Sequence, residues 1–257
     1  MILRRVIEHV KAQQWTAVFL DFVIVVLGVF IGIQVSNWNA ARHDAREARE
    51  YIERIQEDLL ANQQDMAMRA DYFADIKAHA LAALNAREKL PEDLGDQFLV
   101  DSFIASYSLT RSFQRNTYDE LLSAGAMNKI PNVDIRNRIA EYYRVAEGSQ
   151  YYMNTVPSYV DALRGVMPYG VQAALRDGGC NARFSTDARG AIAATAPENC
   201  PLDNSLTEKA AAIRKLLAAD LEADLTRALA DFDLKIQIFK LWEGRAQVLY
   251  DYLEETK

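Results

Sequence analysis

Few residues in this chain have the type and spacing that catalysis or metal binding requires. The three histidines, His9, His43 and His79, lie far apart on faces expected to be solvated or interfacial, so the sequence predicts no metal cluster. It contains no glycine-rich phosphate loop, no GxSxG motif and no HExxH motif. We therefore expect no catalytic residues, no cofactor and no metal, and the chain is not predicted to be an enzyme.

Two other groups of polar side chains could bind a ligand. Arg111 and Arg115, one helical turn apart, could hold an anion, although such a pair is usually just solvated. Five tyrosines follow in a predicted helical region, as its core and surface or, alternatively, as the lining of a groove: Tyr142, Tyr143, Tyr151, Tyr152 and Tyr159.

The two cysteines lie in the one loop-like region, residues 165–204, which concentrates glycine and proline. A bridge between Cys180 and Cys200 would stabilise the domain by about 3 kcal/mol, and it would persist only in an oxidising compartment. We expect this disulfide, with two unrelated free thiols as the alternative. Their spacing excludes a CxxC metal or redox motif. The large domain is therefore expected outside the cytoplasm.

Residues 16–36 form an apolar stretch with a single charged residue, Asp21. A helix of this length covers about 31 Å, the thickness of a bilayer's hydrocarbon core. Trp15 and Trp38 flank it, as interfacial aromatic residues do. We predict a transmembrane helix over residues 16–38. The apolar run is too long for a cleaved signal peptide, so an uncleaved signal anchor is favoured.

One stripe of this helix has residues suited to helix packing. Asp21, Val25, Gly28, Gly32 and Val35 follow one another at spacings of four, three, four and three. Gly28 and Gly32 form a GxxxG pair, which allows a second helix to approach closely in lipid. An intramembrane carboxyl normally faces protein or water. The stripe therefore predicts helix packing through Asp21, Gly28 and Gly32, with chance occurrence as the alternative.

The rest of the chain reads as all-α. Residues 1–15 are expected to form an interfacial amphipathic segment or a frayed basic tail. Residues 39–257 are expected to form an extracytoplasmic helical domain, whose Cys-containing loop spans residues 165–204. The span is expected to continue into a long stalk helix, or else to break at residues 36–39. Apolar residues on this stalk recur at helical spacing: Ile52, Ile55, Leu59, Met66, Phe73, Ile76, Ala80 and Leu84.

Local signals mark the helix ends of the domain. Thr117 with Glu120, and Ser205 with Glu208, read as capping boxes that open helices. Gly125 supplies a left-handed stop and Asn132 an N-cap. Further helices are expected over residues 97–109, from 132 with an interruption at Pro157, and from 205 to the end. The last helix would return along the stalk with a near-heptad rhythm, which gives an antiparallel helical bundle with coiled-coil character.

Two blocks of sequence, VLGVFIGIQVSNWNAAR and TYDELLSAGAMNKIPNVDIRNRIAEYY, resemble a bacterial family of membrane-anchored proteins catalogued as domain of unknown function 6090. Asp21, Gln34, Asn37, Trp38 and Asn39 match the family's anchor pattern, whereas Ser36 and Ala40 depart from it. The blocks cover under a quarter of the chain. The resemblance implies a single-pass anchor in a bacterial inner membrane and no assigned activity.

These observations predict a membrane-tethered scaffold rather than a ligand-processing protein. Its net charge of −7 argues against a nucleic-acid partner. The expected partners are the lipid bilayer and either a second copy or another membrane protein. The expected topology has a cytoplasmic N-terminus and a periplasmic C-terminal domain. Two alternatives stay open: an extracytoplasmic ligand sensor with a separate transducer, and a stator-like ion-coupled subunit that uses Asp21.

Overall fold

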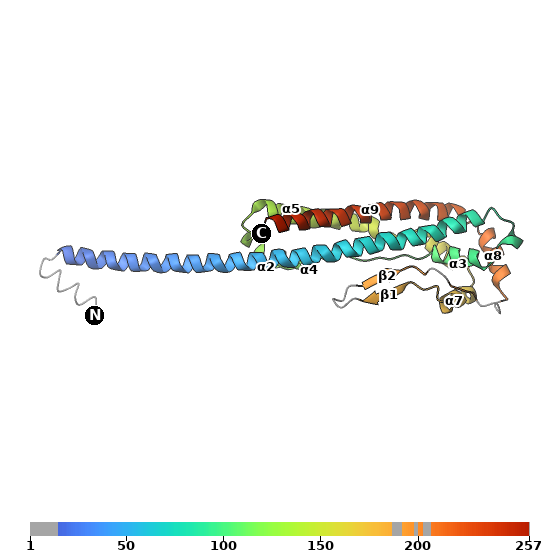
Figure 1. Ribbon diagram of the computed structural model, residues 1–257, viewed down its shortest axis with the longest axis horizontal. Coiled ribbons are helices and arrows are strands. Elements are labelled where there is room, and N and C mark those ends of the chain that lie inside the picture. The colour runs from blue at the N-terminus through green and yellow to red at the C-terminus, as the bar shows by residue number, and fades with distance from the viewer. Residues whose placement is uncertain (1–14, 187–191, 198–199, 203–206, 257) are drawn as a thin grey trace.

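The computed structural model describes residues 15–186, 192–197, 200–202 and 207–256, and the chain is mostly helical, at 78%. The predicted interfacial segment and His9 lie outside the described residues. The helices are α2 (Trp15–Ala86), α3 (Asp96–Ile104), α4 (Asn116–Ser123), α5 (Val133–Asn154), α6 (Ser158–Val166), α7 (Tyr169–Asp177), α8 (Lys209–Ala218) and α9 (Glu222–Glu255). Short 3-10 helices η1 (Pro91–Asp93) and η2 (Ala126–Lys129) and strands β1 (Arg183–Thr186) and β2 (Ile192–Thr195) complete the described elements (Figure 1).

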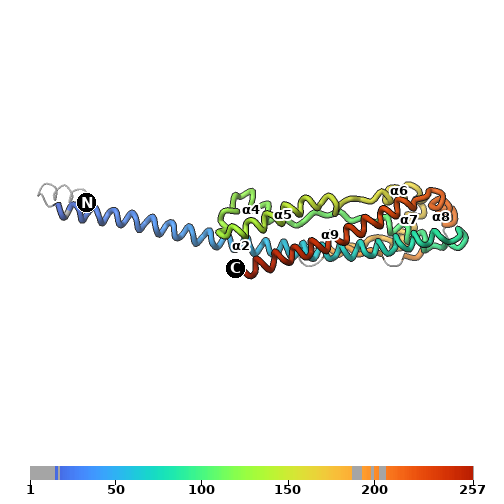
Figure 2. Tube along the Cα trace, turned by 90° about the horizontal axis from the view of Figure 1, so that it is seen from above, coloured from blue at the N-terminus to red at the C-terminus, as the bar shows by residue number. Residues whose placement is uncertain are grey.

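Helix α2 is one uninterrupted helix of 72 residues. Its N-terminal part is long and apolar enough to cross a membrane, with a mean hydropathy of 2.6 over its most apolar window and none of that window buried. The helix passes through residues 36–39 without a break, as predicted, because alanines and charged helix formers follow these weak helix formers. Both views show this part of α2 extending alone beyond the packed helices (Figures 1 and 2).

Helix α9 packs along the C-terminal half of α2 in the opposite direction. Gln56 donates to Glu254 at 2.9 Å near one end of the pair, and Lys77 donates to Asp233 at 2.5 Å near the other. The predicted inward residues of α2 are confirmed: Ile55, Leu59, Met66, Phe73, Ile76 and Ala80 are buried, and Ile52 and Leu84 pack against the core half-buried.

Helix α5 lies against α9 and encloses an aromatic core. Trp242 is 1% exposed, and its ring centroid lies 5.4 Å from those of Phe113 and Tyr142. The apolar spacing of α5 predicts that Val133, Ile135, Ile139, Tyr142 and Tyr143 face inward, and all are buried except Val133, which is 53% exposed at the first turn. Tyr151 and Tyr152, in the last turn of α5, are exposed as well.

Several predicted helix boundaries are confirmed. The Asn132 side chain accepts from the backbone N–H groups of Asp134 and Ile135 at 2.9 and 3.4 Å and so caps α5. Gly125 has the left-handed φ of 62° that ends α4. Pro157 separates α5 from α6 because it cannot continue the hydrogen-bond ladder. The helix expected over residues 97–109 is shorter, because α3 ends at Ile104.

The capping box predicted from Thr117 and Glu120 is wrong. Helix α4 begins at Asn116, and the backbone N–H of Thr117 donates to Asp58 Oδ2 on α2 at 3.0 Å. Glu120 instead accepts from Arg54, also on α2, at 3.0 Å. A neighbouring helix therefore supplies the cap that the local sequence was expected to supply.

The predicted single last helix is also wrong, since the chain breaks between α8 and α9. Asp220 has a φ of 46°, a conformation that aspartate tolerates better than most residues. Arg87 at the end of α2 holds this corner through Asp220 at 3.2 Å and Glu222 at 3.8 Å. Ser205 lies outside the described residues, and Glu208 precedes α8 without a side-chain cap.

The region expected to be a bridged loop, residues 165–204, contains regular structure. It holds α7 and an antiparallel two-stranded sheet in which Arg183 pairs with Thr195 and Thr186 with Ile192. The fold is thus mostly helical with one small β-hairpin, which corrects the all-α expectation. The hairpin β1–β2 lies along α2, mainly through β2.

Candidate functional site

The predicted helix-packing stripe lies on the projecting part of α2. Gly28 and Gly32 have no atom outside their own helix turns within 4 Å of the position that a Cβ would take. Val25 and Val35 on the same stripe are 51% and 57% exposed. Asp21 belongs to the stripe and is half-buried. The structure therefore places these five residues on one ridge of α2, and no described residue approaches Gly28 or Gly32 on it.

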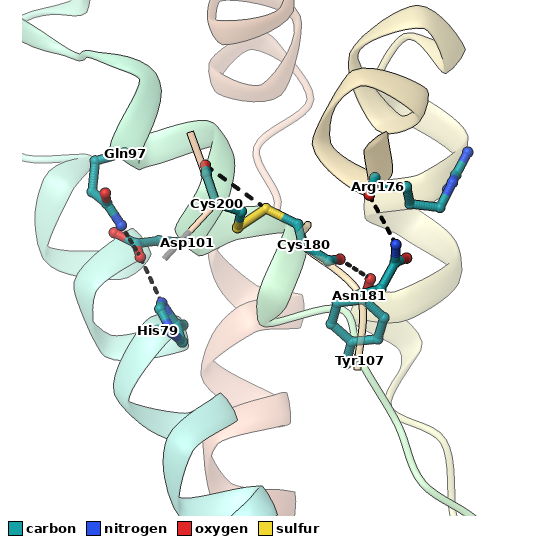
Figure 3. The surroundings of a disulfide bond; sticks show 8 residues. All are labelled: His79, Gln97, Asp101, Tyr107, Arg176, Cys180, Asn181 and Cys200. Carbon is teal, nitrogen blue, oxygen red and sulfur yellow. Dashed lines mark hydrogen bonds and ion pairs between the residues drawn. A yellow bond between two sulfur atoms is a disulfide. The ribbon is translucent and has the colours of Figure 1, made fainter. Parts of the chain in front are cut away.

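The predicted disulfide is confirmed between Cys180 and Cys200, whose Cα atoms are 5.0 Å apart. Figure 3 shows the bond between the end of α7 and the α2–α3 pair, with the Tyr107 hydroxyl donating to the Cys180 carbonyl. Asn181 donates to the Arg176 carbonyl at 2.8 Å and fastens the chain after the cysteine to the end of α7. The bridge thus joins the end of α7 to the segment after β2 and closes the base of the hairpin.

The other predicted polar candidates are already paired. Arg111 and Arg115 lie in an irregular segment before α4 rather than on a helix turn. Arg111 contacts Asp65, and Arg115 binds Asp119 at 2.9 Å and Glu147 at 3.4 Å. Each guanidinium therefore has a carboxylate partner within the protein, which leaves little positive charge for a free anion.

The described histidines sit in two different environments. His79 was expected to be solvated, but it is half-buried and its Nδ1 lies 2.7 Å from Asp101 Oδ1, because α3 packs on that face of α2 (Figure 3). His43, Asp44 and Glu47 have potential metal-ligand atoms within 4.8 Å of one another. Lys129 Nζ lies 2.5 Å from Glu47 and 3.8 Å from Asp44, so an ammonium group already pairs with both carboxylates.

Two buried cations meet where α5 ends. Arg69, with 0% exposure, donates to the Met153 carbonyl at 3.4 Å and to Asn154 Oδ1 at 3.2 Å, and lies 3.6 Å from Asp65. Lys235, with 1% exposure, donates to the carbonyls of Met153 at 2.9 Å and Thr155 at 2.5 Å. Both cations therefore satisfy carbonyl groups that the break before α6 leaves without helical donors.

Burial dominates the pKa shifts at this cluster. It lowers the pKa of Lys235 to about 8, with the nearby Arg69 charge acting in the same direction. Burial also raises the pKa of Asp65, even though Arg111 and Arg69 oppose that shift. The sequence signal for Lys235 was its position three residues after Phe232 and four before Phe239, which places it on the apolar stripe of α9.

A groove of about 1270 Å³ runs between α4, α5 and α9 on the side of α9 away from α2, and we call it the α9 groove. Its apolar residues include Leu122, Leu241 and Val248, which are 51%, 57% and 65% exposed. Five basic residues line it against two acidic ones: Arg115, Arg138, Arg144, Lys240 and Arg245 against Glu141 and Glu147.

No family model, no curated protein and no solved structure matches this chain significantly. The resemblance to the membrane-anchored bacterial family therefore stays a prediction, and the candidate sites are argued from this chain alone.

Proposed function

We propose that this chain is a non-enzymatic scaffold tethered to a bacterial inner membrane, as the family resemblance implies. In this proposal α2 crosses the bilayer once with its N-terminus in the cytoplasm. Residues 39–257 then form a periplasmic helical bundle. The stripe of Asp21, Gly28 and Gly32 binds a transmembrane helix of another protein in a membrane complex.

The uncovered glycine pair is the observation that supports this proposal best. Within the described residues, open space surrounds Gly28 and Gly32, and the first contacts of the domain with α2 are those of Lys129 with Asp44 and Glu47. At about 100° per residue, the stripe and the domain-facing residues Tyr51 and Ile55 lie roughly 140° apart around α2. A helix bound to the stripe would therefore approach from a side turned away from the described part of the domain.

The stalk favours another protein over a second copy as the partner. Arg46, Glu50, Glu53 and Glu57 continue the side of the stripe and are exposed. Two copies in register would bring three glutamates of each chain together, and like charges at helix contacts are destabilising. A partner with a neutral or basic stem avoids that repulsion.

The test is crosslinking in native membranes of the protein carrying Gly28→Leu and Gly32→Leu. Because leucine side chains prevent close helix approach, we expect the crosslinked partner band to be lost. Val23→Leu with Val26→Leu adds bulk to the opposite side of the span and should leave the band in place. An undiminished band in the glycine variant would refute the proposal.

The disulfide supports the periplasmic assignment, because such bonds persist in oxidising compartments. A phosphatase fused after Lys257 should be active in cells, since it would be exported together with the domain. Alkylation of both cysteines in intact protein without a reductant would contradict this topology.

A further inference from the structure

The cations of the α9 groove are incompletely matched by acidic groups. Arg144 binds Glu141 at its rim, and Arg115 binds Asp119 and Glu147. Arg138, Lys240 and Arg245 form no ion pair with any residue in the described part of the chain. Arg138 lies over the Tyr252 ring at 4.1 Å, and Arg245 over the Trp242 ring at 5.2 Å. A chain with a net charge of −7 therefore keeps a local excess of positive charge around exposed apolar side chains.

Two apolar residues of the groove, Leu241 and Val248, form a seven-residue repeat on α9 together with Leu234, which lies beyond the groove lining. Leu234, Leu241 and Val248 are seven residues apart on α9 and are 46%, 57% and 65% exposed. This heptad stripe covers about 21 Å, four turns of a helix. A seven-residue repeat keeps one face of a helix directed at a second helix along its length. The shape of the surface thus suits an amphipathic helix.

The groove lies too far from the membrane for lipid to fill it. Thr117, next to the groove residue Tyr118, donates to Asp58, and Gln247 is hydrogen-bonded to Gln63. Arg69 lies 4.4 Å from the Phe239 ring, so the groove is level with residues 58–69 of α2. With about 1.5 Å of rise per residue, that level begins roughly 33 Å beyond residue 36 at the end of the predicted span. Headgroups extend only a few ångströms past the hydrocarbon layer.

A second copy of this chain is a poor occupant for electrostatic reasons. Two copies anchored in one membrane would align their α9 helices in parallel. With Leu234, Leu241 and Val248 at the seam, Lys240 of one copy would face Arg245 of the other across it. The ammonium group of Lys240 and the guanidinium group of Arg245 would repel each other there. A partner helix with carboxylates at the facing positions would instead be attracted to both.

We infer that the α9 groove is a docking site for an acidic amphipathic helix of another protein on the same side of the membrane. Leu241 and Val248 contact the apolar face of that helix. Arg138, Lys240 and Arg245 pair with its flanking Asp or Glu residues. The inference rests on the proposed function only in requiring a protein partner, and it uses a surface remote from the transmembrane stripe.

The test measures binding of two synthetic peptides to the full chain in nanodiscs of neutral phosphatidylcholine. Both peptides are about four heptads long with the same leucine seam, and they carry Glu or Lys at the flanking positions. We expect the Glu peptide to bind and the Lys peptide to bind about tenfold more weakly or not at all. High salt should weaken binding of the Glu peptide. Equal binding of both peptides would overturn the inference.

Variants of the chain make the result specific to the groove. Leu241→Asp with Val248→Asp should abolish binding of the Glu peptide. Lys240→Glu with Arg245→Glu should reverse the preference towards the Lys peptide, a gain that a misfolded protein would not show. Arg214→Glu with Lys215→Glu makes the same change in net charge on exposed positions of α8 and should retain the original preference. An unreversed preference in the groove variant would refute the assignment.

The Gly28→Leu and Gly32→Leu variant separates this inference from the proposed function. It should bind the Glu peptide as well as the unaltered chain does, whatever happens to its partner in the membrane. Loss of peptide binding in this variant would contradict the independence of the two surfaces.

Discussion

At the scale of single residues, Arg69 and Lys235 are charged groups in an otherwise apolar and aromatic interior. Each donates to the Met153 carbonyl near the end of α5. A cation is favoured there because the last carbonyls of a helix carry partial negative charge. Removal from water opposes that preference, and the lowered pKa of Lys235 shows that desolvation is the larger effect.

The lowered pKa of Lys235 predicts a pH-dependent stability. Between its folded pKa of about 8 and its unfolded pKa of 10.5, the unfolded chain binds more protons, so stability should increase as pH rises through this window. The contribution is about 3 kcal/mol at most. Above a pH of about 10 the gain should reverse, because burial raises the pKa of Tyr142 and Tyr159 and the unfolded tyrosines ionise first.

Thermal unfolding of the purified protein across this pH range measures the effect. Lys235→Met should remove the rise in melting temperature between pH 8 and a pH of about 10. Lys215→Met, at an exposed position on α8, should retain it. An identical profile for the unaltered chain and the Lys235 variant would show that the lysine is not the titrating group.

Gly178 is a residue where a side chain has no space. A Cβ at this position would overlap the backbone carbonyl oxygen of Pro201, which the disulfide at Cys200 holds against the end of α7. Gly178→Ala should therefore destabilise the protein by about 1–3 kcal/mol. Gly148→Ala, with open space around it on α5, should stabilise by about 0.5–1 kcal/mol. Urea unfolding compares the two, and equal effects would contradict the close contact.

At the scale of elements, α4 is held by α2 rather than by its own sequence. Asp58 accepts from the Thr117 N–H, and Glu120 binds Arg54. Asp58→Ala should cost about 1–2 kcal/mol and speed amide exchange in α4, because a buried N–H loses its acceptor. Glu57→Ala, exposed one residue earlier, should change stability by less than about 0.5 kcal/mol. Unchanged exchange in the Asp58 variant would mean that α4 does not need this cap.

Elements whose signals are local could be predicted from the sequence. Asn132 and Pro157 act on backbone groups within a few residues, and the predicted boundaries at both are confirmed. Asp58 capping α4 and Arg87 holding the corner at Asp220 are contacts between segments far apart in the sequence. No local pattern contains such contacts, which is why the capping box and the single last helix were wrong.

The two candidate surfaces, the glycine stripe and the α9 groove, also differ in whether local sequence could predict them. The Gly28 and Gly32 stripe could be predicted because the helical repeat alone places its members on one ridge. The α9 groove could not, because its residues become neighbours only when α5 packs on α9. Its one sequence signal was the heptad of Leu234, Leu241 and Val248, which lies outside the near-heptad set that was expected to form the core.

At the scale of the whole molecule, the continuity of α2 fixes the relation between its two candidate surfaces. Because α2 has no break, it fixes both the distance along its axis and the angle around its axis between the predicted span and the domain. The stripe therefore faces away from the domain, and the groove lies at a defined distance from the predicted span. Both relations would be lost if α2 bent at residues 36–39 in a bilayer.

Spin-label distances in nanodiscs test this continuity. Labels at Gly32→Cys and Glu57→Cys are 25 residues apart across the segment in question, so we expect one narrow distribution near 37 Å, about 1.5 Å per residue. Glu57→Cys with Ala82→Cys has the same separation and nearly the same helical phase within the packed part of α2, and it should give a matching distribution.

The native cysteines are bonded to each other and do not take up label. Dilution with unlabelled protein removes distances between molecules. A broad or markedly shorter distribution for the first pair alone would show a hinge between span and domain, and the fixed height of the α9 groove would no longer follow.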